Sequence, residues 1–313
     1  MAKLDLSKKT IKKKLLLCIL YHNKNINLNK LLKKIQLDLV DQVLIINDGI
    51  NYFFKKDGYK KIKFINQAKK DFSISINRNI ALKYAQKKNF DLILFLDSDI
   101  IPLKKLIENH LNAHKKNPNI IAVGGPVIPS FTKSNINFWE FLDGRLSWFT
   151  SIDKNFSYYV EWPYHLPTCN LSLQVSKLFK KKIKFNENIR TGEDANLFSQ
   201  IRNKETKAFF DKNCKVKHDD RKDFLSFINH HIQWGRHQYY NLFKIYNNKL
   251  AKFLFIIFYP LIYPAIVLLQ TFFVIKKWCS KNILYIFLFP LFFLVFSLKS
   301  LATYYEGYND FFK

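Results

Sequence analysis

The residues best suited to chemistry in this sequence are two aspartates that follow an apolar run. Asp97 and Asp99 stand two positions apart, directly after the run from Leu92 to Leu96. Carboxylates with this spacing at the end of a buried strand can share one hard divalent cation, Mg²⁺ or Mn²⁺, which keeps open positions for a substrate diphosphate. The alternative is a solvated strand end, because aspartate is common in turns.

Two further residues precede this pair and could bind a nucleotide. Asp48 ends an earlier apolar run, where a carboxylate can bond a nucleobase or a ribose hydroxyl. An ordinary Asp-Gly turn explains the same residue. Arg78 stands at the start of a predicted helix and can meet phosphate both as a planar donor and beside the helix dipole. The alternative for Arg78 is a surface position.

Three acidic or imidazole side chains follow later in the chain. Glu193 and Asp194 begin a predicted helix, where a carboxylate that faces a nucleotide can act as general base for an acceptor hydroxyl. Simple stabilisation of the helix N-terminus is the alternative. His218 follows a short strand-like segment and is either a third metal ligand or an ordinary polar residue. His110 and His114 lack a zinc-binding pattern and are predicted on one face of a surface helix.

The elements that must position these residues alternate between strands and helices before residue 225. Apolar runs suited to strands cover 15–21, 43–46, 62–65, 92–96 and 120–123, and helical spacing covers 28–37, 76–87 and 103–116. This alternation predicts a mostly parallel α/β sheet. Ligands of such sheets bind at the carboxyl ends of the strands, which is where Asp48, Asp97 and Asp99 fall.

The last part of the chain is different, because it contains two long apolar runs. Residues 253–275 carry no charge and would reach roughly 34 Å as a helix at ~1.5 Å per residue, enough for a hydrocarbon core. A second run covers 283–298 and extends to about 302. Pro260, Pro264 and Pro290 could kink these helices, or mark a re-entrant or interfacial segment. Two buried core helices are the alternative.

The charge balance points to an anionic neighbour. Lys and Arg number 51 against 24 Asp and Glu, a net charge of +27, and no acidic residue occurs between Asp223 and Glu306. The absence of a recognised nucleic-acid motif and the apolar tail favour a membrane with anionic lipids over nucleic acid. The four cysteines are far apart, which excludes a disulfide scaffold or zinc ribbon. The basic residues that could lie against head groups are Lys222, Arg236, Lys244, Lys249 and Lys252.

The polar elements, in their order and spacing, resemble glycosyltransferase family 2 over roughly residues 13 to 240. Asp97-Ser98-Asp99 matches the family's DxD motif, whereas Asn47 replaces the first aspartate of its Asp-Asp-Gly-Ser motif. The elements that carry the resemblance are Leu17 to Lys24, Ile46-Asn47-Asp48-Gly49, Asn77-Arg78-Asn79, Asp97-Ser98-Asp99 and Gly192-Glu193-Asp194.

The resemblance implies a GT-A fold and a metal-dependent, inverting transfer of sugar from a nucleoside-diphosphate sugar to a hydroxyl. It implies that Asp48, Arg78 and Asp97 hold the donor. Asp97 and Asp99 would hold Mg²⁺ or Mn²⁺, with Asp99 the more direct ligand. His218 would be a further ligand of the metal or the diphosphate.

The acceptor side follows from the same resemblance. Asp194, with Glu193 as substitute, would deprotonate the acceptor hydroxyl. Gln233 to His237 is close to the Gln-x-x-Arg-Trp signature of processive polysaccharide synthases, but His237 stands at the tryptophan position. We therefore expect transfer of one or a few sugars, to a lipid-linked or cell-surface glycan precursor. Arg236 would contact the diphosphate or a lipid phosphate, unless it is a helix-face charge near the membrane.

The expected organisation has three parts: a GT-A domain at 1–225, a basic helical linker at the membrane surface at 226–250, and two membrane helices with a short tail at 251–313. The helices are expected at about 253–275 and 283–302. Because nucleotide sugars are cytosolic, the catalytic domain should face the cytosol. The alternatives are a processive polysaccharide synthase, a nucleotidyltransferase of similar fold and a non-catalytic basic membrane scaffold.

Overall fold

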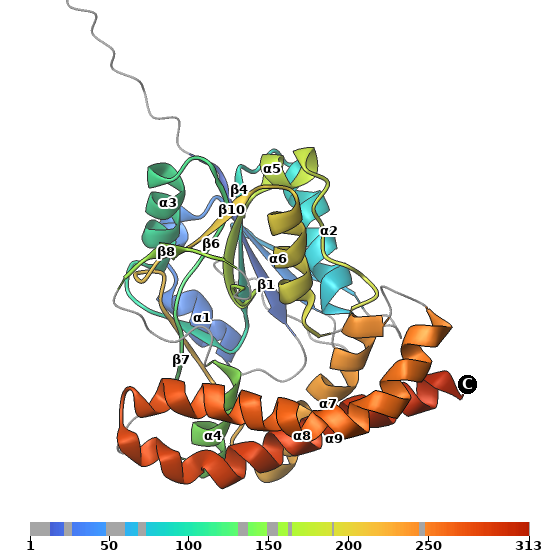
Figure 1. The fold of residues 1–313 in the computed structure, drawn as a ribbon. Coiled ribbons are helices and arrows are strands. Elements are labelled where there is room, and N and C mark those ends of the chain that lie inside the picture. Colours follow the sequence, from blue (N-terminus) through green and yellow to red (C-terminus); the bar gives the residue numbers. More distant parts are fainter. Residues whose placement is uncertain are drawn as a thin grey trace, which may run out of the picture.

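The computed structural model describes residues 13–21, 27–47, 60–67, 73–130, 137–148, 156–161, 165–189, 191–243 and 248–312. Figure 1 shows an α/β unit that stands on a long helical hairpin. The strands are β1 (Leu15–Tyr21), β2 (Gln42–Asn47), β3 (Ile62–Asn66), β4 (Leu92–Asp97), β5 (Ile100–Pro102), β6 (Ile120–Gly124), β7 (Val127–Pro129), β8 (Tyr158–Tyr159), β9 (Asn170–Gln174), β10 (Lys207–Phe210) and β11 (Val216–His218). The helices of the α/β unit are α1 (Asn27–Lys34), η1 (Leu37–Leu39), α2 (Ile74–Lys87), α3 (Leu106–Lys116), α4 (Phe138–Ser147), α5 (Val175–Lys180) and α6 (Glu193–Asn203).

The central sheet has eight strands in the order β3-β2-β1-β4-β9-β6-β10-β8. Its first four strands are parallel to one another, and β9 runs antiparallel between β4 and β6. A second, three-stranded sheet has the order β5-β11-β7. The predicted α/β class with a largely parallel sheet is confirmed, and this arrangement is the GT-A fold.

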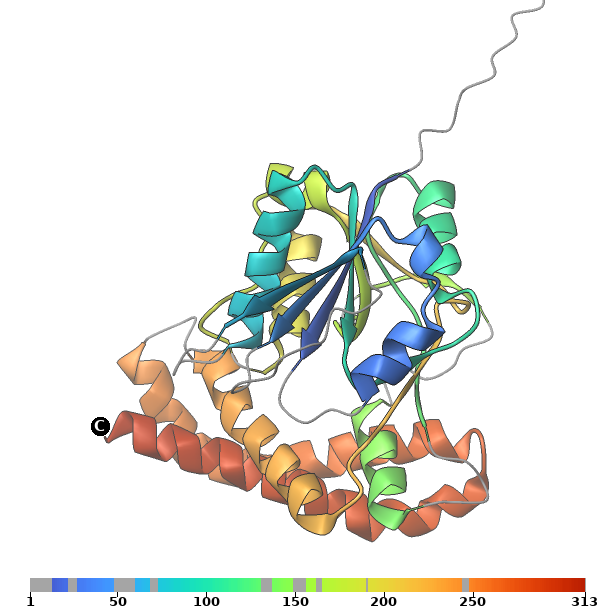
Figure 2. The same ribbon diagram turned by 180° about the vertical axis from the view of Figure 1, so that it is seen from behind.

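Both faces of the inner strands β1, β2 and β4 are buried, which explains why these strands are mostly apolar. Side chains of a strand point alternately to opposite faces. Leu15, Leu17 and Ile19 of β1 therefore pack on the side of α1 and α3. Leu16 and Cys18 pack on the side of α2, α5 and α6. Figure 2 shows the two helical layers on either side of the sheet, and its first strands ending toward the hairpin. Parallel sheets covered on both faces have such continuous apolar strands.

The histidines of α3 are a correction to the sequence interpretation. His110 and His114 were expected on a surface helix, but both are buried against β9. The Ser172 hydroxyl lies 2.9 Å from Nδ1 of His110 and 2.9 Å from Nε2 of His114. Nε2 of His110 lies 3.1 Å from Oδ1 of Asn170. Asn170 and Ser172 of β9 are therefore the hydrogen-bond partners of these buried histidines. The spacing of residues in the sequence does not reveal this role.

Burial of His110 leads to a testable pH dependence. Desolvation lowers the pKa of His110 to about 4, against an unfolded value of 6.5. The unfolded chain therefore binds a proton below pH 6.5 that the folded chain does not, so stability falls as the pH falls toward 4. We expect urea unfolding in detergent to show a loss of stability between pH 7 and pH 5, to which His110 contributes roughly 2 kcal/mol and which is smaller in His110→Gln. As a control, His165→Gln replaces a partly exposed histidine outside the helices and strands. It should leave the change of unfolding free energy with pH as in the wild type.

Three long helices follow the α/β unit. They are α7 (Phe224–Phe243), α8 (Lys249–Cys279) and α9 (Phe289–Phe311), with a 3-10 turn, η2 (Ile283–Leu288), before α9. The segments 249–279 and 283–311 are long and apolar enough to cross a membrane by length and composition, which weakly indicates membrane association. The expected apolar runs lie inside these segments. Figure 1 shows α8 and α9 side by side beneath the α/β unit.

Candidate active site

The site lies at the carboxyl edge of the first strands. Because β1 pairs in parallel with both β2 and β4, the last residues of these strands, Asn47 and Asp97, lie at the same edge. Asn47 is buried, and its amide donates to Oδ1 of Asn66 at the end of β3, 3.1 Å away. The next residue, Asp48, was expected to hold the donor and lies outside the described residues.

Arg78 connects two parts of the site. Its side chain is 2% exposed on α2, and one guanidinium nitrogen donates to Oε1 of Glu193. The other terminal nitrogen lies 3.5 Å from Oδ1 of Asp97. The guanidinium also lies over the ring of Phe185, and its Nε is buried without a hydrogen-bond partner. In this structure Arg78 thus holds the end of β4 to the start of α6 through two carboxylates.

Glu193 and Asp194 take different positions at the start of α6. They follow Gly192, whose φ of 80° lies in the left-handed region that favours glycine. Burial raises the pKa of Glu193, although the ion pair with Arg78 acts in the opposite direction. Asp194 is more exposed, at 19% of its side chain, and its Oδ2 lies 3.7 Å from Nε2 of His165. Of the two carboxylates, that of Asp194 is therefore the more accessible to solvent.

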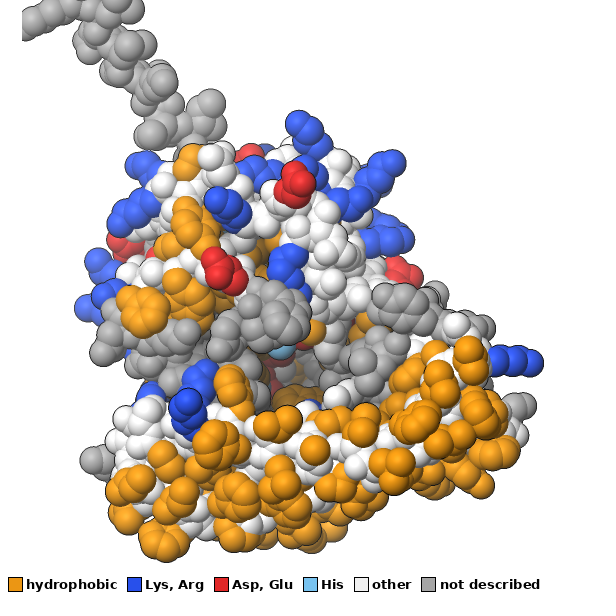
Figure 3. Space-filling view, in the orientation of Figure 1, with side chains coloured by type: hydrophobic (Ala, Val, Ile, Leu, Met, Phe, Trp, Pro, Cys, Tyr) orange, Lys and Arg blue, Asp and Glu red, His pale blue; other side chains and the backbone are white. Residues whose placement is uncertain are grey.

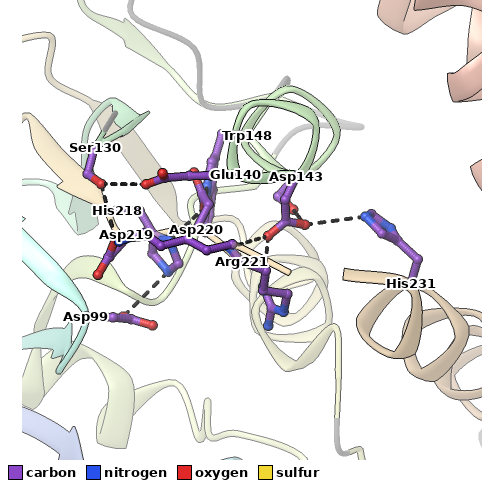
Figure 4. A network of polar contacts seen from close by, with 12 residues as sticks. Asp99, Ser130, Glu140, Asp143, Trp148, His218, Asp219, Asp220, Arg221 and His231 are labelled. Carbon is purple, nitrogen blue, oxygen red and sulfur yellow. Dashed lines mark hydrogen bonds and ion pairs between the residues drawn. The ribbon is translucent and has the colours of Figure 1, made fainter. Parts of the chain in front are cut away.

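His218 is held in a fixed orientation beside Asp99 (Figure 4). Antiparallel pairing of β11 with β5 sets His218 opposite Ile100, so the ring approaches Asp99, and Nε2 lies 3.5 Å from Oδ1. Nδ1 lies 2.8 Å from Oδ1 of the buried Asp220, which also accepts a 2.7 Å hydrogen bond from Nε1 of Trp148. Burial opposes the charged ring, but Asp99 and Asp220 raise the pKa of His218 to about 9.

The network of Figure 4 continues from His218 to α4 and α7. Asp143 of α4 is fully buried, 3.1 Å from the Arg221 guanidinium and 3.4 Å from Nε2 of His231 on α7. Burial alone would raise the pKa of Asp143, but His231 and Arg221 hold it below its usual range. Buried charges need such partners, because an unpaired carboxylate away from water is costly. The contact of Asp143 with His231 therefore joins α4 to α7, in addition to their apolar packing.

The buried thiol of Cys169 feels the charges of several acidic residues of the site. Cys169, before β9, has its pKa raised by burial first, and then by the charges of Asp97 and Asp99, with Asp194 adding to the effect. Arg78 acts on the same thiol with opposite sign. Residues from β4, the loop after it, α2 and α6 are thus all close enough to influence one side chain. Figure 3 shows the surface hollowed between the α/β unit and the hairpin, with acidic and histidine side chains in the hollow.

The residues present fit a divalent cation only in part. Among the described residues, no three His, Cys, Asp or Glu side chains come together as a metal site. Oδ1 of Asp99 is nevertheless buried, has no hydrogen-bond partner in the part of the chain that the structure describes, and lies 3.5 Å from Nε2 of His218. Asp220 contacts the other ring nitrogen of His218, Nδ1, and metal-binding histidines are usually oriented by a carboxylate in this way. Asp99 and His218 could therefore supply two ligands, and a bound diphosphate the others.

Asp220 should affect the metal affinity of Asp99 and His218 without contacting a substrate. If Asp220 orients His218, Asp220→Asn should raise the Mn²⁺ concentration needed for half-maximal activity about 10- to 100-fold. Asp219→Asn, a neighbour that pairs with Lys222 at 2.9 Å, is the matched control and should keep the wild-type value. Mn²⁺ titrations of donor turnover measure both. An equal loss of maximal rate in the two variants, with no change in metal requirement, would contradict this role.

Arg236 lies on α7 against the hairpin. Its Nε is 3.8 Å from Oε2 of Glu306 on α9, and its guanidinium lies near the ring of Tyr305. The expected contact of Arg236 with a diphosphate has no support from these neighbours and stays a prediction. The next residue, His237, which stands at the tryptophan position of the expected signature, contacts the segment before α6, with its Nδ1 2.6 Å from the Thr191 hydroxyl.

Sequence reasoning missed the supporting residues. Asp220, Trp148 and Asp143 act through contacts between segments far apart in the chain, and no local spacing marks them. One signal was available, because Asp220 lies two residues after His218 on an extended segment, so both can face the same side. The pairing of Thr191 with His237 has no such signal.

This fold and site define a class of enzyme: a GT-A transferase that takes a nucleotide-sugar donor and a glycan acceptor. The model of the glycosyl transferase family 2 matches residues 17–174, about half of the chain. The chain belongs to this family and is a glycosyltransferase.

Two known proteins are similar to it. The minor teichoic acid biosynthesis protein GgaB of Bacillus subtilis (strain 168) is 30% identical over 190 residues, which are 58% of this chain and 20% of that protein. The chain thus spans about a fifth of this relative. The mannosyltransferase PcManGT from Pyrobaculum calidifontis, solved with GDP-Man and Mn²⁺, superimposes with a TM-score of 0.51 at 11% identity, covering 76% of this chain and 66% of that one. At this identity the match supports the fold.

Proposed function

We propose that the chain transfers a sugar, with inversion, from a nucleoside-diphosphate sugar to a hydroxyl of a lipid-linked or cell-surface glycan precursor at a membrane. The observation that carries the proposal is the buried Oδ1 of Asp99, which has no hydrogen-bond partner among the described residues and lies 3.5 Å from the oriented Nε2 of His218. A buried oxygen without a partner calls for a ligand, and a carboxylate with an imidazole suits a divalent cation.

In the proposed mechanism, Asp99 and His218 hold Mg²⁺ or Mn²⁺, with Asp97 beside them. When bound, the metal supplies charge stabilisation for the leaving diphosphate. Asp194 accepts the proton of the acceptor hydroxyl as that oxygen attacks the anomeric carbon. Its partial exposure lets it meet an acceptor. A single displacement of this kind inverts the anomeric centre.

Arg78 and Glu193 have a supporting role in this mechanism. Arg78 contacts Asp97 and also Glu193 at the start of α6. It thereby keeps the donor-binding end of β4 in a fixed position relative to Asp194, the proposed base. Glu193 is occupied by that ion pair, which favours Asp194 over Glu193 as the base. Asp48 remains our candidate for the nucleoside, on the resemblance alone. Once the donor is bound, the guanidinium of Arg78 could also turn toward the diphosphate.

The acceptor is proposed from the surroundings of the site. The carboxyl edge of the sheet faces the apolar hairpin (Figure 2), so an acceptor held at a membrane surface would reach Asp194 without leaving that surface. The name of the relative GgaB connects it with minor teichoic acid, which supports a cell-surface glycan precursor. We propose a cytosolic catalytic domain, because that is where nucleotide sugars are found, and anionic lipids as its membrane partners.

A donor screen tests the proposal. Purified full-length protein in detergent is incubated with Mn²⁺ and one nucleotide sugar at a time, and the released nucleoside diphosphate is measured. We expect one donor to be turned over, only with a divalent cation, and the product to have the opposite anomeric configuration by NMR. Turnover that survives chelation, or product with retained configuration, would contradict the mechanism.

A further inference from the structure

The hairpin of α8, η2 and α9 has one face that is covered with exposed apolar side chains (Figure 3). On α8 this face continues without a break for most of its length. Exposed apolar patches of this extent are rare on monomeric soluble proteins and mark a binding surface. The large exposed side chains of α8 are Leu250, Phe253, Leu254, Ile257, Phe258, Leu261, Ile262, Leu268, Leu269, Phe272 and Phe273.

The opposite face packs against the α/β unit and α7, which we call together the catalytic unit. The following contacts lie at the middle of the hairpin. Val267 of α8 and Phe292 of α9 are fully buried in one apolar cluster with Leu142 of α4 and Phe227 of α7. Gly235 of α7 lies so close to α9 that a Cβ placed on it would be 2.1 Å from a backbone oxygen. The Thr303 hydroxyl donates to the Gly235 carbonyl, 2.8 Å away.

The two ends of the hairpin are also attached to the same body. At the turn, Arg145 of α4 donates to the Tyr285 hydroxyl at 3.0 Å, and its guanidinium lies 4.2 Å from the centre of the Trp278 ring. At the far end, Asp310 of α9 accepts a 2.8 Å hydrogen bond from Tyr239 of α7. The hairpin therefore lies flat along the catalytic unit, attached at its turn, its middle and its open end.

A flat hairpin does not fit a bilayer crossing. If α8 crossed a hydrocarbon core of ~30 Å, its turn would emerge on the side opposite the catalytic unit. Arg145, which contacts Trp278 and Tyr285 at the turn, would then have to lie on that opposite side as well. The buried ion pair of Asp143 with Arg221, on the face of the hairpin toward the catalytic unit, would lie within the hydrocarbon core. Charged groups at that depth are costly. Immersion of the outer face alone leaves all of these contacts intact.

We propose that the outer face of the hairpin lies in the plane of one membrane leaflet, with lipid acyl chains as its partner. The inference deepens the proposed function and rests on it only for the acceptor, which would enter from the same leaflet. Charge supports lipid over a protein partner, since Lys249 at one end and Lys276 and Lys281 at the turn are exposed. These cations can meet anionic head groups. All three lie on the same side of the membrane as the catalytic unit in this arrangement.

Immersion depth tests this inference. Single spin labels are placed at exposed positions of α8, Leu254→Cys, Leu261→Cys and Leu269→Cys, in a Cys279→Ser background. The full chain is reconstituted into vesicles of phosphatidylcholine and phosphatidylglycerol, and depth is measured from collisions with oxygen and a nickel chelate. We expect all three labels at a similar depth, about 5–10 Å below the head groups. A gradient along the helix that reaches the bilayer centre, or no immersion at all, would overturn the inference.

A sidedness measurement gives an independent readout. In sealed vesicles with the catalytic unit outside, a membrane-impermeant maleimide should label Lys281→Cys at the turn as fully as Lys104→Cys on the catalytic unit. Labelling of Lys281→Cys only after the vesicles are opened would show a crossing hairpin. Neither the depth measurement nor the labelling depends on catalysis. A failure of the proposed sugar transfer in the donor screen would therefore leave this inference about the hairpin unaffected.

Discussion

Replacing Asp194 with asparagine is expected to lower the turnover number about 10³-fold, within the range that a general base contributes. The amide keeps the size of the side chain but cannot accept the proton of the acceptor hydroxyl. Binding of the donor should be unchanged, because the carboxylate lies toward His165 and solvent and not against Asp99. Steady-state release of nucleoside diphosphate gives the rate, and calorimetry with Mn²⁺ and donor gives the affinity.

Glu193→Gln is the matched control for this substitution. It removes the adjacent carboxylate, which is buried and paired with Arg78. We expect a lower unfolding temperature in Glu193→Gln, since a buried arginine loses a charged partner, whereas Asp194→Asn should unfold like the wild type. If Asp194→Asn kept activity while a folded Glu193→Gln lost it, the base would be Glu193.

Replacing Asp99 with asparagine should remove both turnover and metal-dependent donor binding. Asp99 supplies the buried oxygen that faces His218, and an amide is a much weaker ligand for a hard cation. We expect at least a 100-fold loss of kcat/KM, the scale of losing one strong electrostatic contact to the leaving group. The Mn²⁺-dependent part of the donor affinity should disappear as well, which separates this variant from Asp194→Asn.

Asp91→Asn is the matched control at the opposite end of the same strand. The Asp91 carboxylate accepts a hydrogen bond from the Lys14 backbone, far from the carboxyl edge of the sheet. It should keep the wild-type kcat/KM and metal requirement. A loss in Asp91→Asn as large as in Asp99→Asn would mean that both substitutions act through the fold.

The fold was predictable because its strands are buried on both faces. The runs that end at Asn47 and Asp97 have few polar residues, and between them lie segments of helical spacing, a combination that parallel sheets require. The order of elements along the chain is enough to place Asp97 and Asp99 at the carboxyl edge of the sheet. Asp194 was added as the base from the family resemblance, and that role stays a prediction.

The supporting contacts were not predictable, because they depend on how distant segments meet. His110 was assigned to a surface although β9 offers it Ser172 and Asn170 inside the core. The predicted contact of Arg78 with a phosphate stays a prediction, but the contacts of its guanidinium with two carboxylates were not predicted. In both cases the residue type and its spacing were compatible with either environment. The flat position of the hairpin likewise depends on α4 and α7, whose packing surfaces are recognisable only after assembly.

Anomalous diffraction from crystals soaked with Mn²⁺ and a nucleoside diphosphate tests the central claim most directly. The account predicts one manganese peak within ligand distance of Oδ1 of Asp99 and Nε2 of His218, with diphosphate oxygens completing its coordination. A diphosphate bound at the carboxyl edge without manganese beside Asp99, or manganese bound elsewhere on the chain, would contradict it.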